Sequence, residues 1–391
     1  MKQKGLSCLG TGGKFCNKME EIVIVGAGAI GRGFLEWVLD TASYELVFVD
    51  KKKDLVTELN RRKQYRTYRT KAGVLEEKLV AVKEACHISE FSPEKHNRAS
   101  AVFVNVGPRN CVEAASHLKG IKCPIVLCEN EPQTVEEVKY ALNYERVYFA
   151  VPDVITSNTA SPDILSRDPI SVITEDGVLF VDEKAGNIKG SMVLCSGKEL
   201  SKQWTAKLYL HNTPHCIAAY VGALMGMHYV HEAMNIERIR EIVVGSMNEM
   251  LDALKLRWDI PHEFLDWYAD KEIKRFSNKL LYDPVSRVAR EPLRKLGLGG
   301  RLIGAAQICL SQGFVPKNIL TGIVSALLFE NEEDADYHLR FMRKSVSEDV
   351  LLHYILGLRE GEALEIIMKE RLAKIISEVE DMIKNPKKVH A

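Results

Sequence analysis

The stretch Glu21-Ile-Val-Ile-Val25-Gly26-Ala-Gly28-Ala-Ile30-Gly31-Arg-Gly33 decides the fold expected for this chain. The apolar, β-branched run Glu21–Val25 predicts a buried strand, and Ile30–Asp40 predicts the helix that follows it. Between them, Gly26 permits a tight turn, Gly28 lets the backbone approach a pyrophosphate, and Gly31 lets the helix pack closely on the strand. A strand, this glycine spacing and a helix together predict a dinucleotide-binding loop, with cofactor contacts from Gly26, Gly28, Ile30 and Gly31.

A carboxylate follows at the distance that such a loop requires. Glu45–Asp50 predicts the second strand, and Asp50 ends it about 20 residues after the glycines, where a carboxylate accepts the ribose hydroxyls of the adenosine. The same charge would repel a 2′-phosphate, so the sequence favours NAD over NADP. Three lysines, Lys51 to Lys53, could soften that repulsion, but we expect them to be solvated residues at a helix start.

Strands and helices alternate through the first half of the chain. This pattern predicts an α/β fold with a mostly parallel, doubly wound sheet of the Rossmann type. A loop is predicted at Ser157–Asp168, and Ile170–Val181 predicts a hairpin that turns at Glu175-Asp-Gly177. From about Ser201 the spacing becomes helical.

We therefore divide the chain into a dinucleotide-binding domain at residues 19–196 and a helical substrate domain at residues 197–385. Residues 1–18 are expected to be a disordered leader or the result of a wrongly assigned translation start, because Met19 directly precedes the first strand. Residues 386–391 form a tail.

Composition excludes several classes of protein. With 53 basic and 53 acidic residues, the chain lacks the excess of positive charge that is typical of nucleic-acid-binding proteins. No apolar run approaches the ~20 residues of a membrane span. The nine cysteines are scattered and form no C-x-x-C pair, which favours a cytoplasmic location and argues against disulfides or structural zinc. No metal site is expected, and the sequence does not decide between a monomer and a homodimer.

A second motif, Lys207-Leu-Tyr-Leu-His-Asn212-Thr-Pro-His215, carries groups suited to proton transfer. Pro214 predicts a helix start, with Asn212 and His215 on its first turn and Lys207 just before it. A buried lysine can act as a general base, because burial lowers its pKa. An amide and an imidazole N–H can stabilise the alkoxide that then develops.

This motif resembles the K-x-x-x-x-N-x-x-H signature of the polyol-specific long-chain dehydrogenases. The cofactor loop and the Cys128-Glu129-Asn130 stretch are similar to that family too, and the resemblance runs from about Glu21 to Ile383. The segment from Arg275 to Arg301 is most similar to the branch that acts on mannitol 1-phosphate. Val154 stands where the family usually has an arginine.

The resemblance implies roles for individual residues. Lys207 would be the general acid/base, with Asn212 and His215 polarising the reacting oxygen. Asn130 would help stabilise the alkoxide, and Asp153 and Arg275 would lie at the substrate.

Apart from the resemblance, the cations between Arg287 and Arg301, with Arg294 and Lys295 as the best candidates, could bind a substrate phosphate. The alternative is that they pair with carboxylates such as Glu291 and Asp283 or are solvated.

The resulting expectation is an NAD-dependent oxidoreductase that interconverts mannitol 1-phosphate and fructose 6-phosphate, without a metal ion. A hexuronate or free-polyol dehydrogenase of the same family is an alternative, since Val154 puts the substrate in doubt. A non-catalytic NAD-binding sensor is a third possibility, although a sensor has no need of Lys207.

Overall fold

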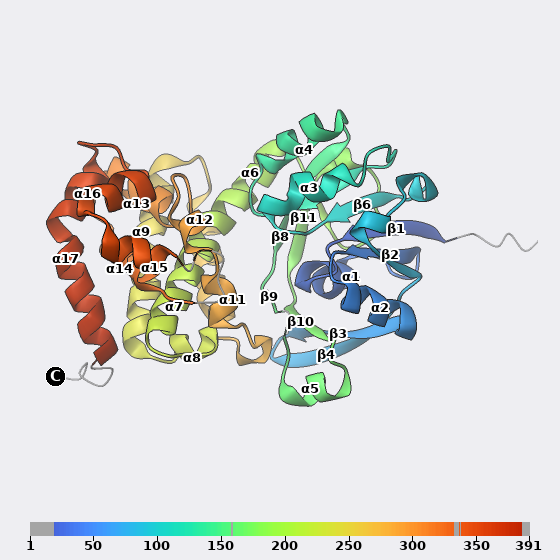
Figure 1. Cartoon of the computed structure of the whole chain (residues 1–391), viewed down its shortest axis with the longest axis horizontal. Coiled ribbons are helices and arrows are strands. Elements are labelled where there is room, and N and C mark those ends of the chain that lie inside the picture. The colour runs from blue at the N-terminus through green and yellow to red at the C-terminus, as the bar shows by residue number, and fades with distance from the viewer. Residues whose placement is uncertain (1–18, 158, 332–335, 337, 385–391) are drawn as a thin grey trace, which may run out of the picture.

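The computed structural model describes residues 19–384, except 158, 332–335 and 337. Figure 1 shows two lobes, one built around a β-sheet from the first half of the chain and one built from helices of the second half. The predicted leader at 1–18 and tail at 386–391 lie outside the described residues.

The main sheet is mostly parallel, as predicted. In the part of the chain that the structure describes it has eight strands, of which β11 and β12 run antiparallel to the other six. In spatial order the strands are β12 (Val193–Cys195), β11 (Val178–Asp182), β8 (Val147–Asp153), β7 (Ile125–Cys128), β6 (Ala101–Val104), β1 (Glu20–Val25), β2 (Tyr44–Asp50) and β5 (Glu84–His87).

The order of these strands fixes where a ligand can bind. The chain moves outward from β1 through β2 to β5, then returns to β6 on the other side of β1 and continues through β7 to β8. In doubly wound folds, ligands bind beyond the carboxyl ends of the strands at such a reversal point. Here, that point lies between β1 and β6.

Helices cover both faces of this sheet. Side chains of α1 and α2 pack on one face, and those of α3 and α4 pack on the other. The helical segments of this half are η1 (Ala29–Phe34), α1 (Leu35–Val38), α2 (Lys53–Arg62), η2 (Ile88–Glu90), η3 (Pro93–His96), η4 (Pro108–Asn110), α3 (Cys111–Ser116), α4 (Thr134–Leu142), α5 (Pro162–Arg167) and η5 (Glu183–Ala185). The doubly wound fold class is thereby confirmed.

Two local predictions in this half are wrong. The expected loop at Ser157–Asp168 contains α5, because Ser161 caps it by accepting from the N–H of Ile164 and Pro162 opens its first turn. The expected hairpin within Ile170–Val181 does not form either. Its two strands belong to different sheets, since β10 pairs with β3 and β9 whereas β11 pairs with β8.

A second, smaller sheet accounts for the failed hairpin. Its spatial order is β4 (Val74–Ala81), β3 (Gln64–Lys71), β10 (Val172–Glu175) and β9 (Thr156–Ser157). At Gly177 the chain crosses between the sheets so tightly that a Cβ there would lie 2.6 Å from the Cβ of Val154. The Asp-Gly pair therefore marks a crossing point.

The second half is built from helices joined by loops, and its described residues from Gly197 onward contain no β-strand, apart from an isolated bridge between Tyr229 and Pro284. Its helical segments are α6 (Gly197–Ala206), η6 (Lys207–Asn212), α7 (Thr213–Leu224), α8 (Val230–Met234), α9 (Glu237–Arg257), α10 (His262–Phe276), η7 (Lys279–Leu281), α11 (Val285–Ala289), α12 (Pro292–Leu296), α13 (Ile303–Ser311), α14 (Lys317–Leu328), α15 (Leu339–Ser345), α16 (Glu348–Val350), η8 (Leu351–Ile355) and α17 (Ala363–Lys384).

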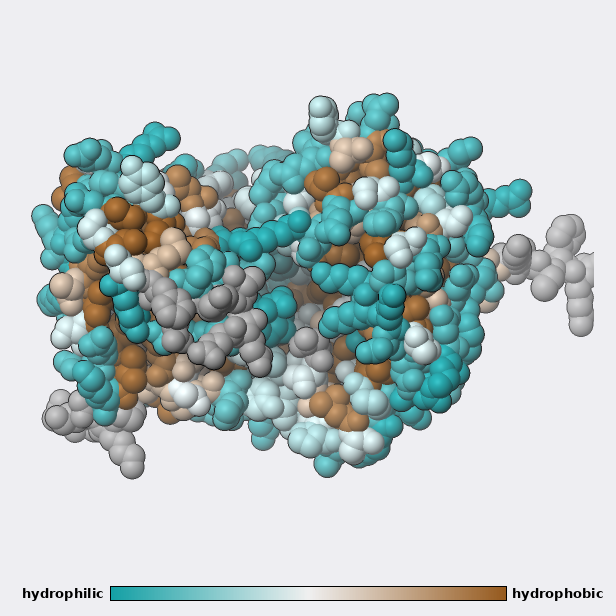
Figure 2. Space-filling model, viewed as in Figure 1, coloured by the Kyte–Doolittle hydropathy of each residue, from teal (hydrophilic) through white to brown (hydrophobic). Residues whose placement is uncertain are grey.

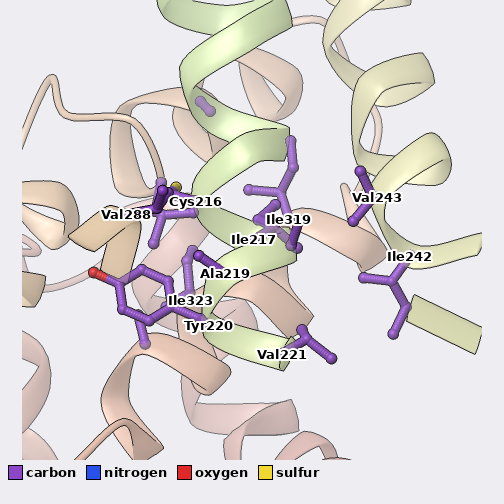
Figure 3. Close-up of a cluster of buried hydrophobic side chains, with 14 of the residues drawn as sticks. Cys216, Ile217, Ala219, Tyr220, Val221, Ile242, Val243, Val288, Ile319 and Ile323 are labelled. Atoms are coloured by element: carbon purple, nitrogen blue, oxygen red, sulfur yellow. The ribbon is translucent and has the colours of Figure 1, made fainter. Parts of the chain in front are cut away.

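Helix α7 lies at the centre of this half, where it is buried from Thr213 to Gly222. A helix that is apolar on every side requires neighbours all around it. Figure 3 shows Ile217 and Tyr220 of α7 among side chains of α9, α11 and α14. Gly322 of α14 lies so close that a Cβ there would come within 2.4 Å of Ile217. This packing anchors the helix that carries the second motif.

Candidate active site

The glycine loop after β1 is shaped by two close approaches, at Gly26 and Gly31. Gly26 has a φ of +91°, and a Cβ there would lie 2.6 Å from the carbonyl oxygen of Asn105. A Cβ on Gly31 would lie 2.2 Å from the carbonyl oxygen of Gly26, whereas Gly28 has no atom within 4 Å of a Cβ position. Gly26 and Gly31 thus permit the turn, and Gly28 leaves room beside it.

A cavity of about 480 Å³ opens beside this loop. It is bordered by Gly26, Gly28, Ile30 and Asp50, while Gly31 lies behind the loop. The helix predicted at Ile30–Asp40 is observed at Ala29–Val38, and its first six residues form the wider π-helical segment η1.

Asp50 holds the loop as well as bordering the cavity. Its Oδ2 accepts a hydrogen bond of 2.7 Å from the N–H of Ala27, and its Oδ1 accepts one of 2.9 Å from the N–H of Lys52. The carboxylate is therefore fixed at the end of β2. The sequence predicted its position, but not its bond to the loop.

Arg32 is a residue of the loop that the sequence did not single out. Its side chain is buried, its Nε donates to the carbonyl of Ala27 at 2.5 Å, and its Nη1 donates to the carbonyl of Ile170. The guanidinium ties the loop to the segment before β10 and also borders the cavity. In the sequence, only its place among the glycines of the loop could have indicated that Arg32 has a structural role there.

The Lys207–His215 motif lies within a continuous helical path. Pro214 and His215 lie in the first turn of α7, as predicted, but the chain before that turn is already helical. Helices α6 and α7 are joined by η6, a π-helix of six residues. Proline inside a helix removes one backbone donor and crowds the preceding turn. The wider turn relieves this, and the carbonyl of Leu208 accepts both the N–H and the hydroxyl of Thr213.

This π-helix directs the motif into one cavity. About 250 Å³ in volume, the cavity is bordered by Lys207, His211, Asn212 and His215. Residues four or five apart share a face in such a wide turn, which brings Lys207 beside His211 and Asn212. The cavity shares Ile30 with the one beside the glycine loop, so the two are neighbours.

Lys207 is held across the two halves of the molecule. Its Nζ donates to Oδ1 of Asn130 at 3.0 Å and to the carbonyl of Pro152. Burial is the largest cause that lowers its pKa, and Arg275 and Arg301 lower it further, to about 8. Lys207 can therefore lose its proton near neutral pH.

His215 is oriented by a carboxylate. Its Nε2 lies 2.9 Å from Oδ2 of Asp283, whose other oxygen accepts from Arg287, and its ring stacks on Phe276 with the planes 2° apart. The remaining ring nitrogen, Nδ1, is the one left for a ligand. Asn212 borders the same cavity.

Asp153 and Arg275, expected to contact substrate, lie outside the lining of this cavity. Nη1 of Arg275 lies 2.8 Å from Oδ1 of Asp153, and the same guanidinium also binds Glu175 and Glu272. Burial alone would raise the pKa of Asp153, but Arg275 and Lys271 outweigh it and hold that pKa well below its usual range. The structure thus gives both residues a supporting position behind the cavity.

Three further cations border the cavity, and they differ in their hydrogen-bond and ion-pair partners. Arg294 is paired with Glu291 at 2.8 Å, and Lys295 is buried and donates to the carbonyl of Arg290. Arg301 also borders the cavity, and burial, followed by the nearby Arg294, lowers its pKa to about 10. No carboxylate partner of the Arg301 guanidinium is found among the described residues.

Glu129 is the one carboxylate among the described residues that border this cavity. It is buried, and its Oε1 accepts from the N–H of Gly107 at 2.8 Å. Burial raises its pKa to about 7. In the sequence, its position between Cys128 and Asn130, directly after β7, could have indicated that Glu129 lies at the site.

Three further observations concern metal ligands, membrane-spanning helices and cysteines. The described residues contain no group of three or more His, Cys, Asp or Glu that could hold a metal ion. Within the same residues, no helix combines the length and the apolar character that crossing a membrane demands. The seven described cysteines are free thiols.

Comparison with known proteins identifies the family to which this two-domain chain belongs. Residues 20–194 match the model of the mannitol dehydrogenase Rossmann domain, and residues 200–390 match that of the mannitol dehydrogenase C-terminal domain. The chain belongs to the mannitol dehydrogenase family. It is an oxidoreductase of that family.

Relatives within the mannitol dehydrogenase family include two mannitol-1-phosphate 5-dehydrogenases. The one from Caldanaerobacter subterraneus is 34% identical over 79% of this chain and 86% of its own length. That from Thermoanaerobacter pseudethanolicus is 32% identical over 91% and 98%.

Solved structures share the fold. A Pseudomonas fluorescens mannitol 2-dehydrogenase, in complex with NAD and D-mannitol, superposes with a TM-score of 0.72 at 14% identity, covering 94% of this chain and 92% of that one. A substrate-free D-sorbitol dehydrogenase gives a TM-score of 0.64 at 16% identity, covering 95% and 93%.

Proposed function

We propose that this family member catalyses the reversible, NAD-dependent oxidation of mannitol 1-phosphate to fructose 6-phosphate. The observation that carries the proposal is the charge around the cavity of Lys207. Among the described residues that border it, Glu129 is the one carboxylate, whereas five cations accompany Lys207: Arg287, Arg290, Arg294, Lys295 and Arg301. Such a lining suits an anionic substrate beside a base.

The cavity beside the glycine loop fits a dinucleotide. Gly28 leaves space where a pyrophosphate would approach, and Asp50 lies at the end of β2, where the ribose hydroxyls would bind. Ile30 borders both cavities, so a nicotinamide there would meet the substrate. The mannitol 2-dehydrogenase that shares this fold is a ternary complex with NAD and D-mannitol, so the fold can hold a dinucleotide and a polyol together.

In the proposed mechanism the neutral amine of Lys207 takes the proton from the substrate hydroxyl. When bound, NAD would accept the hydride ion from the same carbon, C5 of the sugar phosphate. The side-chain amides of Asn212 and Asn130 would donate to the reacting oxygen as it becomes a carbonyl, and the ring of His215, oriented by Asp283, would border the same oxygen. In the reverse direction, protonated Lys207 returns the proton.

The phosphate is assigned to the cationic part of the cavity. Arg301 is the leading candidate, because Arg294 already has a carboxylate partner and Lys295 already donates to a backbone carbonyl. A guanidinium can bind phosphate through two parallel hydrogen bonds. Asp153 and Arg275 have no direct contact with substrate in this proposal.

The test is a panel of substrates, with the nicotinamide absorbance measured to give the rate on each one. We expect reduction of fructose 6-phosphate with NADH to exceed that of fructose, of fructuronate, and of any substrate with NADPH. Activity should survive a metal chelator, since the proposed chemistry uses Lys207 as the base. Preference for fructuronate or fructose would establish the hexuronate or free-polyol alternative. NADH binding without turnover of any substrate would favour a sensor.

A further inference from the structure

His211 presents an unpaired ring nitrogen to the cavity of Lys207. Nδ1 of His211 lies 2.5 Å from Oε2 of Glu272, and both side chains are buried. The other ring nitrogen, Nε2, has no hydrogen-bond partner among the described residues, yet it is not enclosed by protein atoms. Because His211 borders the cavity, Nε2 opens into that space. The K-x-x-x-x-N-x-x-H signature does not specify the residue at position 211, so the family resemblance does not account for this histidine.

Glu272 fixes the His211 ring and its proton. Oε1 of Glu272 accepts from Nη1 of Arg275 and lies 3.5 Å from Nζ of Lys271. Burial raises the pKa of Glu272 and Arg275 opposes this, and the guanidinium in direct contact keeps the carboxylate ionised at neutral pH. An ionised carboxylate can only accept, so Nδ1 carries the ring proton. Burial is the largest cause that lowers the pKa of His211, which keeps the ring neutral. Nε2 is therefore a hydrogen-bond acceptor.

A polyol in this cavity would need such an acceptor. Lysine and arginine side chains can only donate, and six of them border the cavity: Lys207, Arg287, Arg290, Arg294, Lys295 and Arg301. Oδ1 of Asn130 and the carbonyl of Pro152 already accept from Lys207. Glu129 accepts from a backbone N–H. A hydroxyl that enters the cavity brings a proton that must find an acceptor, and Nε2 of His211 supplies one.

Neighbouring rings hold His211 in a fixed place beside the base. Its ring packs between those of His215 and Phe276, with centroids 5.0 and 5.4 Å away. In the wide turn of η6, His211 follows Lys207 by four residues and directly precedes Asn212. Since Lys207 and Asn212 are assigned to the reacting oxygen, Nε2 of His211 faces substrate atoms next to that oxygen.

We propose that Nε2 of His211 accepts a hydrogen bond from the substrate hydroxyl on a carbon next to the reacting carbon. His211 is then a specificity-determining residue, because it favours substrates that carry this hydroxyl. The assignment rests on the proposed dehydrogenase function. In fructose 6-phosphate the reacting carbon is C2, so the hydroxyl is the one on C1 or the one on C3.

The test compares substrates that differ by this hydroxyl. The full-length enzyme would reduce fructose 6-phosphate, its 1-deoxy analogue and its 3-deoxy analogue with NADH. We expect kcat/KM for one of the two deoxy analogues to be about ten- to a hundredfold lower, because Nε2 is then left without a partner. The fluoro analogue at the same carbon should lose as much, since fluorine cannot donate to Nε2. Equal rates on all these substrates would overturn the proposal.

His211→Phe keeps an aromatic ring between His215 and Phe276 but removes both nitrogens. The ratio of kcat/KM between fructose 6-phosphate and the deoxy analogue should fall to about twofold or less in this variant. A packing role would instead lower kcat/KM equally on every substrate, and the unchanged ratio would overturn the proposal. Glu272→Gln is the second variant, for the case that His211→Phe does not fold. Its amide can also donate to Nδ1, so the ratio should fall to an intermediate value, and an unchanged ratio would contradict the assignment.

The matched control is His96→Phe. His96 is also buried, its Nδ1 lies 3.0 Å from Oε2 of Glu21 at the start of β1, and its ring stacks on Phe91. It borders neither the cavity beside the glycine loop nor the cavity of Lys207. This variant should keep the full ratio. A ratio that falls as far in His96→Phe as in His211→Phe would show that the effect does not arise in the cavity.

A second measurement needs no turnover, so it separates failure of this assignment from failure of the proposed function. Fructose 6-phosphate and NAD are both oxidised and cannot react with each other. NMR of the histidine ring nitrogens would follow Nε2 of His211 as the sugar phosphate is added to the enzyme with NAD. We expect this signal to shift, and to stay in place with the deoxy analogue that reacts poorly. If fructose is the preferred substrate, the same comparisons are made with fructose and its deoxy analogues. A signal that stays in place with every sugar would overturn the assignment, even in an enzyme that reduces fructose 6-phosphate.

Discussion

Nζ of Lys207 lies 3.0 Å from Oδ1 of Asn130, although 77 residues separate them in the chain. Asn130 follows β7 of the sheet domain, whereas Lys207 belongs to the helical domain. The candidate base is therefore positioned by a hydrogen bond between the domains. Hydrophilic side chains lie along the junction of the two lobes on the face seen in Figure 2. Arg109 of the sheet domain also pairs with Glu291 of the helical domain at 3.5 Å.

The first prediction concerns pH. Because the pKa of Lys207 is lowered to about 8, its neutral form predominates above that pH and its charged form below it. Oxidation should accelerate as pH rises through about 8, and carbonyl reduction should slow over the same range. Initial rates in both directions across a pH series would measure this.

Replacing the base tests its assignment directly. Lys207→Ala should lower kcat for oxidation by about 10²- to 10⁴-fold and remove the pH step, while NAD affinity changes little. Lys198→Ala, at an exposed position in α6, is the control. Near-normal turnover in Lys207→Ala would show that another group moves the proton.

The second prediction concerns the choice of cofactor. Asp50→Asn keeps an oxygen that can accept from the N–H of Ala27 but removes the charge. Activity with NADP relative to NAD should rise by about tenfold or more, because like charges in contact cost several kcal/mol. Asp50→Ala should also loosen the glycine loop and weaken binding of both cofactors. An unchanged ratio in Asp50→Asn would place the ribose elsewhere.

The third prediction concerns the phosphate. Arg301→Gln should lower kcat/KM for fructose 6-phosphate by about one to two decades, as expected for loss of a charge-assisted hydrogen bond of roughly 1.5–3 kcal/mol. Activity with fructose should hardly change. Arg294→Gln is the comparison, and its loss should be smaller because Glu291 already pairs with Arg294. Equal losses on both substrates would mean that Arg301 supports the fold.

The fourth prediction concerns stability where the chain crosses between sheets. In Gly177→Ala the new Cβ would lie 2.6 Å from the Cβ of Val154 and 2.7 Å from the carbonyl of Asp153. The free energy of unfolding should fall by about 1–3 kcal/mol, as in other overpacked sites. Denaturant unfolding measures this. Gly197→Ala, which has no atom within 4 Å of its Cβ position, should unfold normally.

Sequence patterns predicted the features that depend on neighbouring residues. The strand, glycine loop and helix around Gly26 are local, and so is the placement of Asp50 at a strand end. The hairpin at Gly177 failed because the Asp-Gly signal reports a turn, whereas the choice of partner strand depends on β3, about 100 residues earlier. No local pattern carries that information.

In the candidate site, too, the residues of a local motif were predicted, whereas contacts between distant parts of the chain were not. Lys207, Asn212 and His215 border one cavity, but the π-helix that carries Lys207 and Asn212 into α7 was not predicted, because Pro214 usually marks a helix start. Asp153 and Arg275 are 122 residues apart and bind each other, which spacing along the chain cannot reveal. The pairing of His211 with Glu272, 61 residues away, escaped for the same reason.

The π-helix of Lys207–Asn212 makes the site sensitive to residue count. Each residue rotates an α-helix by about 100°, so deleting one residue here would turn α6 and α7 by that angle relative to each other. Either Lys207 or His215 would then leave the cavity. Insertions and deletions in this segment would therefore put the two ends of the motif out of phase, even where every side chain of the motif is kept.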